Sequence, residues 1–406
     1  MKIVVITLVV LLAGIDGFIH YLLTKKPKHI DQRTYEVYDK KTYQKWDAYN
    51  KEKSKLSVIN KGILFLILIT MLILNLHFEI YHWLEGFSYD TYTLNAYFFL
   101  IVTIIPLPIV ITFDYIRIFK IEEKYGFNTQ TKKLFIKDKL IETITLLVLE
   151  TGIVIGLYSI YEETEGLFVL FGLIVAFLFM TLTLIIYPIM SKLYNKFSPL
   201  EEGSLKASIH VLLVSTNSKV SKVLVMNASK RSKKMNAYFT GIGKRRRIVL
   251  YDTTIEGLEE SEIVAVLAHE LGHAKHKDIV KMLPLSFLSI GLIIILLGVF
   301  AGFKPLSTAF GFSDSNFVFS FIILFELFEI MMILIKIPQN KWIRSMEYKA
   351  DQYAVTVHDK ASFISALIKL SKMNLTDLNP HPLIVTLLYD HPTLFQRIDH
   401  IGENHG

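Results

Sequence analysis

The sequence predicts a mostly helical protein that crosses a membrane several times and carries smaller polar segments between its spans. Of its 406 residues, 52% are hydrophobic, and the mean hydropathy of +0.42 is too high for an ordinary soluble protein. Seven stretches are long and apolar enough to cross a bilayer. They cover about residues 3–23, 58–78, 93–115, 141–161, 166–190, 281–301 and 317–337.

The loops between these spans alternate between basic and neutral, and this alternation predicts their orientation. Lysine and arginine are concentrated in the short cytoplasmic loops of membrane proteins. We therefore expect the N-terminus outside and the C-terminus in the cytoplasm. The basic segments are 24–57, 116–140, 191–280 and the part after 338, whereas 79–92, 162–165 and 302–316 together hold a single cation, Lys304.

The spans divide the chain into four predicted parts. Residues 1–190 form an N-terminal membrane part with five spans, and 281–337 form two further spans. Residues 191–280 and 338–406 form two cytoplasmic segments, which hold the residues suited to chemistry.

The first cytoplasmic segment is predicted to contain a small antiparallel sheet followed by a helix. Strand-like patterns occupy Val223–Asn227, Asn236–Thr240 and Arg246–Tyr251, with a turn at Gly241-Ile242-Gly243. Ser261 is expected to cap the helix that follows.

That helix carries His269-Glu270-Leu271-Gly272-His273, the spacing that a catalytic zinc ion needs. Residues four apart lie above one another on a helix, so both imidazoles can reach one metal. Glu270 lies about 100° around the helix from His269, where it can serve as a general base without binding the metal. The chain has no cysteine, so only His, Asp or Glu could complete the site. The pattern indicates a zinc hydrolase with one Zn²⁺ per chain.

Catalytic zinc usually keeps three protein ligands, so one more is needed. Glu347 is the strongest candidate. Asp351 lies four residues later, on the same face of the expected helix, where its carboxylate could orient a ligand imidazole. By spacing alone, a solvated helix with ordinary acidic residues fits equally well. Near the end, His391 and Arg397 could bind an oxyanion, or could lie on the surface of a terminal tail.

These motifs together resemble the type I CAAX prenyl protease family, whose members are integral-membrane gluzincin zinc metalloproteases. The resemblance extends over nearly the whole chain. The matching motifs are Glu122-Glu123-Lys124-Tyr125-Gly126-Phe127-Asn128, Asn236-Ala237-Tyr238-Phe239, Arg247-Ile248-Val249-Leu250-Tyr251-Asp252-Thr253, Leu267-Ala268 with the HELGH sequence, Glu347 with Asp351, and His391-Pro392 with Arg397.

The resemblance implies a zinc metalloendopeptidase in which His269, His273 and Glu347 bind zinc and Glu270 is the general base. His391 and Arg397 would stabilise the oxyanion. It also implies that seven helices enclose a water-filled chamber with the zinc site at its cytoplasmic end. The segment Asn236-Ala237-Tyr238 is expected to form an exposed edge strand that pairs with the substrate backbone.

The expected partners are peptide or protein substrates, which are lipidated or membrane-associated in this family, together with membrane lipids. The basic run Lys244-Arg245-Arg246-Arg247 suits anionic lipid head groups, and no nucleic-acid-binding motif accompanies the net charge of +7. The sequence does not indicate an oligomeric state. A chamber would solvate the charged residues of the spans, which are Asp16, His20, Glu142, Glu150, Glu326 and Glu329.

Compact loops and an end without an ER-retrieval signal favour a bacterial plasma membrane, with the ER membrane as second choice. In a bacterium, quality-control cleavage of membrane or misfolded proteins, without a prenyl requirement, is the alternative function. Two rivals of other classes are a transporter or channel, which the intramembrane carboxylates would fit, and a zinc-stabilised scaffold, which has no need of Glu270 as a base.

Overall fold

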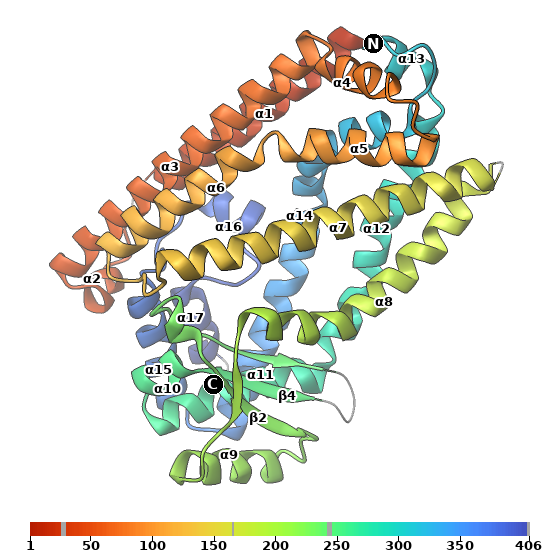
Figure 1. Cartoon of the computed structure of the whole chain (residues 1–406). Helices are drawn as coiled ribbons and strands as arrows, with labels where there is room; N and C mark the ends of the chain where they lie inside the picture. Colours follow the sequence, from red (N-terminus) through yellow and green to blue (C-terminus); the bar gives the residue numbers. More distant parts are fainter. Residues whose placement is uncertain (26–29, 165, 242–245, 404–406) are drawn as a thin grey trace.

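Long helices form an open frame, and a small sheet with shorter helices is gathered at one end of it (Figure 1). The structure is a computed structural model that describes residues 1–25, 30–164, 166–241 and 246–403, without the side chains of 183–190, 329–331 and 403. The N-terminus lies at the end of the frame away from the sheet, and the C-terminus lies at the end that holds the sheet.

Five helices or helix runs are long and apolar enough to cross a membrane, and a sixth is added if the two parts of one bent helix count as one span. These five are α1 (Lys2–Thr24), α3 (Lys40–Ile73), the run Thr91–Glu122, α7 (Lys132–Glu163) and α12 (Asp278–Ala301). The bent helix is α14 (Phe317–Val357). The predicted span 166–190 falls in α8 (Phe168–Tyr194), where part of the side chains are not described, so the count of seven stays a prediction.

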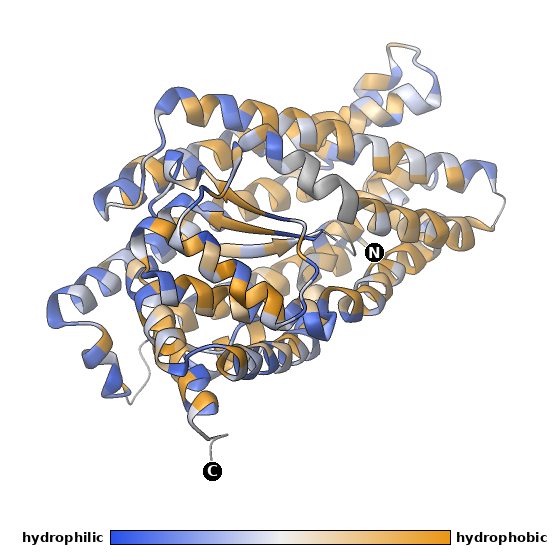
Figure 2. Cartoon of the chain, turned by 90° about the horizontal axis from the view of Figure 1, so that it is seen from below, coloured by the Kyte–Doolittle hydropathy of each residue, from blue (hydrophilic) through white to orange (hydrophobic). Residues whose placement is uncertain are grey.

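Hydrophobic residues recur along the long helices of the frame (Figure 2), and the exposure of many of them indicates contact with lipid. Val148 of α7 is 66% exposed and Leu288 of α12 is 67% exposed. Exposed apolar residues repeated along several long helices would be unfavourable in water, and they are normal against hydrocarbon chains.

Several helices extend well beyond the spans that the sequence predicts. The predicted loop 24–57 contains α2 (Arg33–Val37) and the first half of α3, where the Asp39 side chain caps the helix by accepting from the Thr42 amide. The hydropathy signal stops where lysine, glutamate and glutamine begin, but these residues also favour helix. For the same reason α14 continues past the predicted boundary at 337 and carries Glu347 and Asp351 on its last turns.

The third apolar run is broken into segments that redirect the chain. Helix α5 (Thr91–Ile104) ends just before Pro106, α6 (Leu107–Ile116) follows, and a π-helix, η1, covers Arg117–Glu122. Such π-helical turns often occur near functional sites. The short helices α4 (Leu76–Glu85) and α13 (Lys304–Thr308) connect spans at the end of the frame nearest the N-terminus.

The sheet is mixed, so the prediction of an antiparallel sheet is wrong. Its strands are β1 (Phe197–Pro199), β2 (Lys222–Met226), β3 (Ala237–Thr240) and β4 (Arg247–Tyr251), in the order β1-β2-β4-β3. Strands β3 and β4 are antiparallel as expected, but β2 pairs parallel to β4, and β1 adds antiparallel to β2.

The difference has a physical cause. Residue alternation within a strand indicates its faces but not its neighbours, and the chain between β2 and β3, which includes η2 (Ala228–Lys230), crosses over instead of making a hairpin. The predicted turn begins at Gly241, whose φ of 85° suits glycine, and its other two residues lie outside the described chain.

A hydrophobic core packs the sheet against α11 (Glu260–His276), the helix that carries the HELGH sequence. Ile248 and Leu250 of β4 and Leu267 of α11 are fully buried there. Helix α11 begins one residue before the predicted cap, because Glu259 and Glu262 form a reciprocal capping box. The other helices of this region are α9 (Ser204–Ser215), α10 (Asp252–Gly257), α15 (Lys360–Asn374), α16 (Pro382–Leu388) and α17 (Leu394–Glu403).

The ion pair between Arg231 and Asp138 helps to connect the membrane frame to the segment that precedes β3. Arg231 donates from Nε and Nη2 to the two oxygens of Asp138 on α7, at 2.8 and 2.9 Å. Its Nη2 also donates to the Tyr194 carbonyl at the end of α8, at 2.6 Å. A bidentate pair of this kind fixes orientation as well as distance, so the frame and the start of β3 are held in register.

Candidate active site

Helices α11 and α14 approach each other closely at Gly272, and this approach brings the predicted metal ligands together. A Cβ atom added to Gly272 would lie 2.8 Å from the Cα of Ala350, a distance that real Cβ atoms do not reach. Ala350 is fully buried. Glu347 stands about one turn before Ala350 on α14, so the contact places its side chain opposite the two histidines of α11.

His269, His273 and Glu347 form a compact cluster of possible metal ligands, called the ligand cluster below. One ligand atom from each lies within 4.8 Å of the others. The two Nε2 atoms are 3.2 Å apart, and the Glu347 oxygens lie 3.6 Å from Nε2 of His269 and 3.2 Å from Nε2 of His273. The HELGH motif and Glu347 are therefore far apart in the sequence but adjacent in the structure.

The donor set fits zinc. Glu347 is 3% exposed, and its Oε2 has no hydrogen-bond partner among the described residues. A buried carboxylate oxygen without a partner is costly unless a cation satisfies it. Two imidazole nitrogens and one carboxylate leave a fourth position open, as in catalytic zinc sites.

Each ligand imidazole is held from behind by a carboxylate. Nδ1 of His269 lies 2.8 Å from Oδ1 of Asp351, as the sequence predicted for that residue, and Asp351 is fully buried. Nδ1 of His273 lies 3.0 Å from Oδ2 of Asp278. Carboxylates in this position leave Nε2 free for a metal.

Asp278 is the site residue that sequence reasoning missed. It starts α12, and Lys277 before it adopts a left-handed conformation with a φ of 57° that ends α11. This turn folds Asp278 back against His273, where it is 6% exposed. The only sequence signal is an acidic residue five positions after the second histidine, which does not indicate contact unless the turn is known.

Arg397 of α17 lies on the cavity wall and binds Asp351. Its Nε and Nη2 donate to the two Asp351 oxygens at 2.8 and 2.6 Å, and Nη2 lies 3.4 Å from Nδ1 of His269. The oxyanion role expected for Arg397 stays a prediction. Its observed contacts fix the carboxylate that holds a ligand imidazole.

His391 lies at the open side of the ligand cluster. Its Nε2 is 3.4 Å from Oε1 of Glu347, and its Nδ1 lies 2.8 Å from Oδ1 of Asp390. The side chain is 59% exposed. The Asp390 carboxylate raises the pKa of His391, so the imidazole is a ready donor.

Glu270 is the acidic group of the site that remains free to exchange a proton. Its side chain makes no hydrogen bond or ion pair within the described part of the chain. Burial raises the pKa of Glu270, and the positive charges of His269, His273 and His391 oppose that rise. A carboxylate with a raised pKa is suited to acid–base catalysis near neutral pH.

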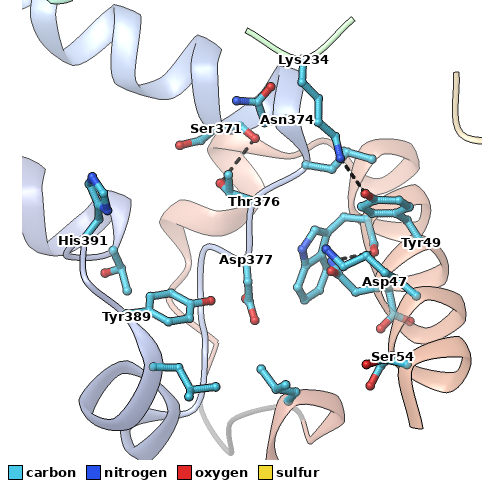
Figure 3. Close-up of a pocket in the computed structure, with 18 of the residues that line it drawn as sticks. Asp47, Tyr49, Ser54, Lys234, Ser371, Asn374, Thr376, Asp377, Tyr389 and His391 are labelled. Atoms are coloured by element: carbon cyan, nitrogen blue, oxygen red, sulfur yellow. Dashed lines mark hydrogen bonds between the residues drawn. The ribbon is translucent and has the colours of Figure 1, made fainter. Parts of the chain in front are cut away.

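A cavity of about 1170 Å³ opens beside the ligand cluster, with His391 and Arg397 on its wall. Figure 3 shows His391 on one side of this cavity and Tyr49 of α3 on the opposite side, with Asp377 and Tyr389 between them. Other wall residues belong to α1, α6, α15, the π-helix and the segment before β3. A cavity lined by frame helices and catalytic segments is in keeping with the chamber expected from the sequence.

Strand β3 lies at the edge of the sheet, as the sequence predicted for Asn236-Ala237-Tyr238. The Tyr251 amide donates to the Asn236 carbonyl at 3.1 Å. Hydrogen bonding alternates along an antiparallel pair, so the amide and carbonyl of Ala237 point away from β4. The Ala237 amide is satisfied by the Asn236 side chain, at 2.9 Å.

The charged residues in the predicted spans have varied surroundings. Asp16 pairs with Lys61 of α3 at 2.6 Å and lies 3.8 Å from His20, which lines the cavity. Glu142 pairs with Lys139 at 2.8 Å. A role of Glu150, Glu326 and Glu329 in the chamber stays a prediction, and the side chain of Glu329 lies outside the described part of the structure.

Two family models match consecutive parts of the chain. Residues 20–196 match the CAAX prenyl protease N-terminal domain, described as five membrane helices, and residues 199–405 match peptidase family M48. The resemblance inferred from the motifs is thereby confirmed.

Individual relatives agree with this assignment. CAAX prenyl protease 1 of Saccharomyces cerevisiae is 34% identical over 74% of this chain and 70% of its own length. A homologue from Oryza sativa is 32% identical over 88% of this chain and 86% of its own. The crystal structure of Ste24p from S. mikatae superposes with a TM-score of 0.91 at 26% identity, and covers 98% of both chains.

With both family models matched, and with a His-His-Glu ligand cluster in the half that matches the peptidase model, the chain belongs to peptidase family M48 in its CAAX prenyl protease branch and is a multi-pass membrane zinc metalloprotease.

Proposed function

We propose that this protease hydrolyses peptide bonds at the ligand cluster, with one zinc ion per chain and with Glu270 as the general base. The observation that carries the proposal is the convergence of His269, His273 and the unpartnered Glu347 oxygen on one point. Bound zinc would polarise the scissile carbonyl and lower the pKa of a water molecule there. The remaining steps belong to the side chains.

Glu270 accepts the proton of the attacking water and later returns it to the amine that leaves. Its raised pKa favours both transfers, because the group must be a base first and an acid afterwards. His391 donates from Nε2 to the oxyanion that develops on the carbonyl oxygen, since its Nδ1 is occupied by Asp390. Asp351, held by Arg397, and Asp278 keep the two ligand imidazoles in the orientation that the metal requires.

The substrate is a peptide in extended conformation that adds to the free edge of β3. The outward amide and carbonyl of Ala237 supply backbone hydrogen bonds, which hold a peptide without selecting its sequence. Because the relatives are named CAAX prenyl proteases, we propose a prenylated C-terminal peptide as the substrate class. Cleavage of unprenylated membrane or misfolded proteins is the alternative, and a transporter has no support from this site.

We also propose that the N-terminus lies outside and that the ligand cluster faces the cytoplasm. The alternation of basic and neutral loops supports this orientation. The bacterial plasma membrane, with the ER membrane second, remains a proposal from loop length alone. A farnesylated peptide compared with its unmodified twin would separate the two substrate classes.

Replacing Glu270 by Gln should abolish cleavage and leave zinc in place. The amide cannot accept the proton of water, and Glu270 is not among the ligands. We expect at least about a hundredfold loss in kcat on a diverse peptide pool, with wild-type zinc content by elemental analysis. Identical product profiles from the two proteins would refute the assignment of Glu270 as base.

Replacing Asp278 by Asn should weaken zinc binding by roughly 10- to 100-fold, because His273 loses the carboxylate that orients it. Zinc affinity is measured by competition with a chelator. The matched control is Lys281→Gln, which removes a cation 3.5 Å from Asp278 and leaves the imidazole contact intact. Equal affinities for wild type and Asp278→Asn would show that Asp278 does not support the site.

Replacing Ala237 by Pro removes the outward amide of the edge strand and should raise KM about tenfold, the effect of one lost backbone hydrogen bond to substrate. Zinc content should not change. Ala237→Ser, which keeps the amide, is the control. Parallel loss of zinc and of substrate affinity in Ala237→Pro would mean that the segment is structural.

A further inference from the structure

Three cations meet in one part of the cavity wall, away from the ligand cluster. Lys53 of α3, Arg117 of the π-helix and Lys234, which precedes β3, all line the cavity. We call these three residues the basic corner. Lys234 binds Glu122, with its Nζ 3.1 Å from Oε2, and Arg117 binds Asp114 at 2.7 Å.

Lys53 is the cation of the corner that forms no ion pair with a carboxylate among the described residues, although it feels the charge of Glu122. Within the described chain its contact is with the ring of Tyr49, whose centroid lies 5.3 Å from the Lys53 Nζ. The Tyr49 hydroxyl does not compensate for this charge, because it accepts from Lys234 at 2.9 Å (Figure 3) and donates to Glu122 at 2.7 Å. The corner therefore presents a surplus positive charge to the cavity, where an anion would be attracted.

The position of the corner relative to β3 indicates which anion it would meet. Lys234 lies two residues before Asn236 and three before Ala237, the residue whose backbone amide and carbonyl point away from β4. A peptide that adds antiparallel to β3 runs in the opposite direction to the strand. Its C-terminal end therefore passes Asn236 and points toward Lys234. Each extended residue advances it by about 3.3 Å, so a few residues reach from the reacting bond into the cavity.

We propose that the basic corner, through Lys53, binds the free α-carboxylate of the substrate peptide. This proposal rests on the proposed function and adds the residue that recognises the C-terminal end of the substrate. Lys234 and Arg117 contribute positive potential, and their own carboxylate partners keep them in place. A lipid phosphate is the other anion that a cavity among membrane helices could admit.

The test compares two forms of a peptide that the wild-type enzyme cleaves, one ending in a free carboxylate and the other in an amide. The wild type should cleave the acid with a kcat/KM about tenfold higher, as expected when one charge-assisted hydrogen bond is lost. In Lys53→Met this preference should disappear through a rise in KM for the acid alone. Lys53→Arg should retain it.

Lys45→Met is the matched control. Lys45 lies on the same helix and contacts an aromatic ring, that of Phe127 at 5.9 Å, but it does not line the cavity. This variant should keep the full preference for the acid.

Equal cleavage of acid and amide by the wild type would overturn the proposal. So would an equal loss on both peptides in Lys53→Met, which is the result expected if the corner holds a lipid phosphate. Failure of the proposed function is distinguishable, because cleavage of both peptides would then persist in Glu270→Gln.

Discussion

The close contact of α11 with α14 at Gly272 and Ala350 is the constraint on which the rest of the site depends. A side chain at position 272 would meet backbone atoms of α14, which cannot move aside as the end of a flexible side chain can. Without this approach Glu347 would stand farther from the two imidazoles. The small residue between the ligand histidines is therefore as necessary for the metal site as the ligands themselves.

The same contact links chemistry to the membrane. Helix α14 runs, with a bend, from the membrane frame to the ligand cluster, and α12 starts at Asp278, which holds His273. Two apolar helices thus carry residues of the site at their polar ends. On the other side, Glu122 of the π-helix binds Lys234 just before the edge strand. Substrate edge, ligand cluster and cavity are consequently positioned by membrane helices rather than by an independent soluble domain.

The sequence predicted those parts of the site that lie within one helix. His269, Glu270 and His273 follow from the helical repeat. The spacing of Glu347 and Asp351 fitted a solvated helix equally well, and the family resemblance implied the ligand role of Glu347. Asp278 was missed because its contact depends on a left-handed turn at Lys277, for which a lysine gives no signal. The prediction of an antiparallel sheet was wrong because alternation does not encode which strands are neighbours. The helices extend beyond the predicted spans because polar residues with high helical propensity follow the apolar stretches.

The most direct test of the central claim is the zinc content and peptide cleavage of Gly272→Ala, measured beside Gly156→Ala, where an added Cβ meets nothing within 4 Å. A displacement of the ligands by about 1 Å can reduce rates roughly 100-fold. We expect Gly272→Ala to lose cleavage activity by about that factor and to bind less zinc, while its helical content is retained. Gly156→Ala should match the wild type in both measurements. Wild-type zinc content and cleavage in Gly272→Ala would contradict it.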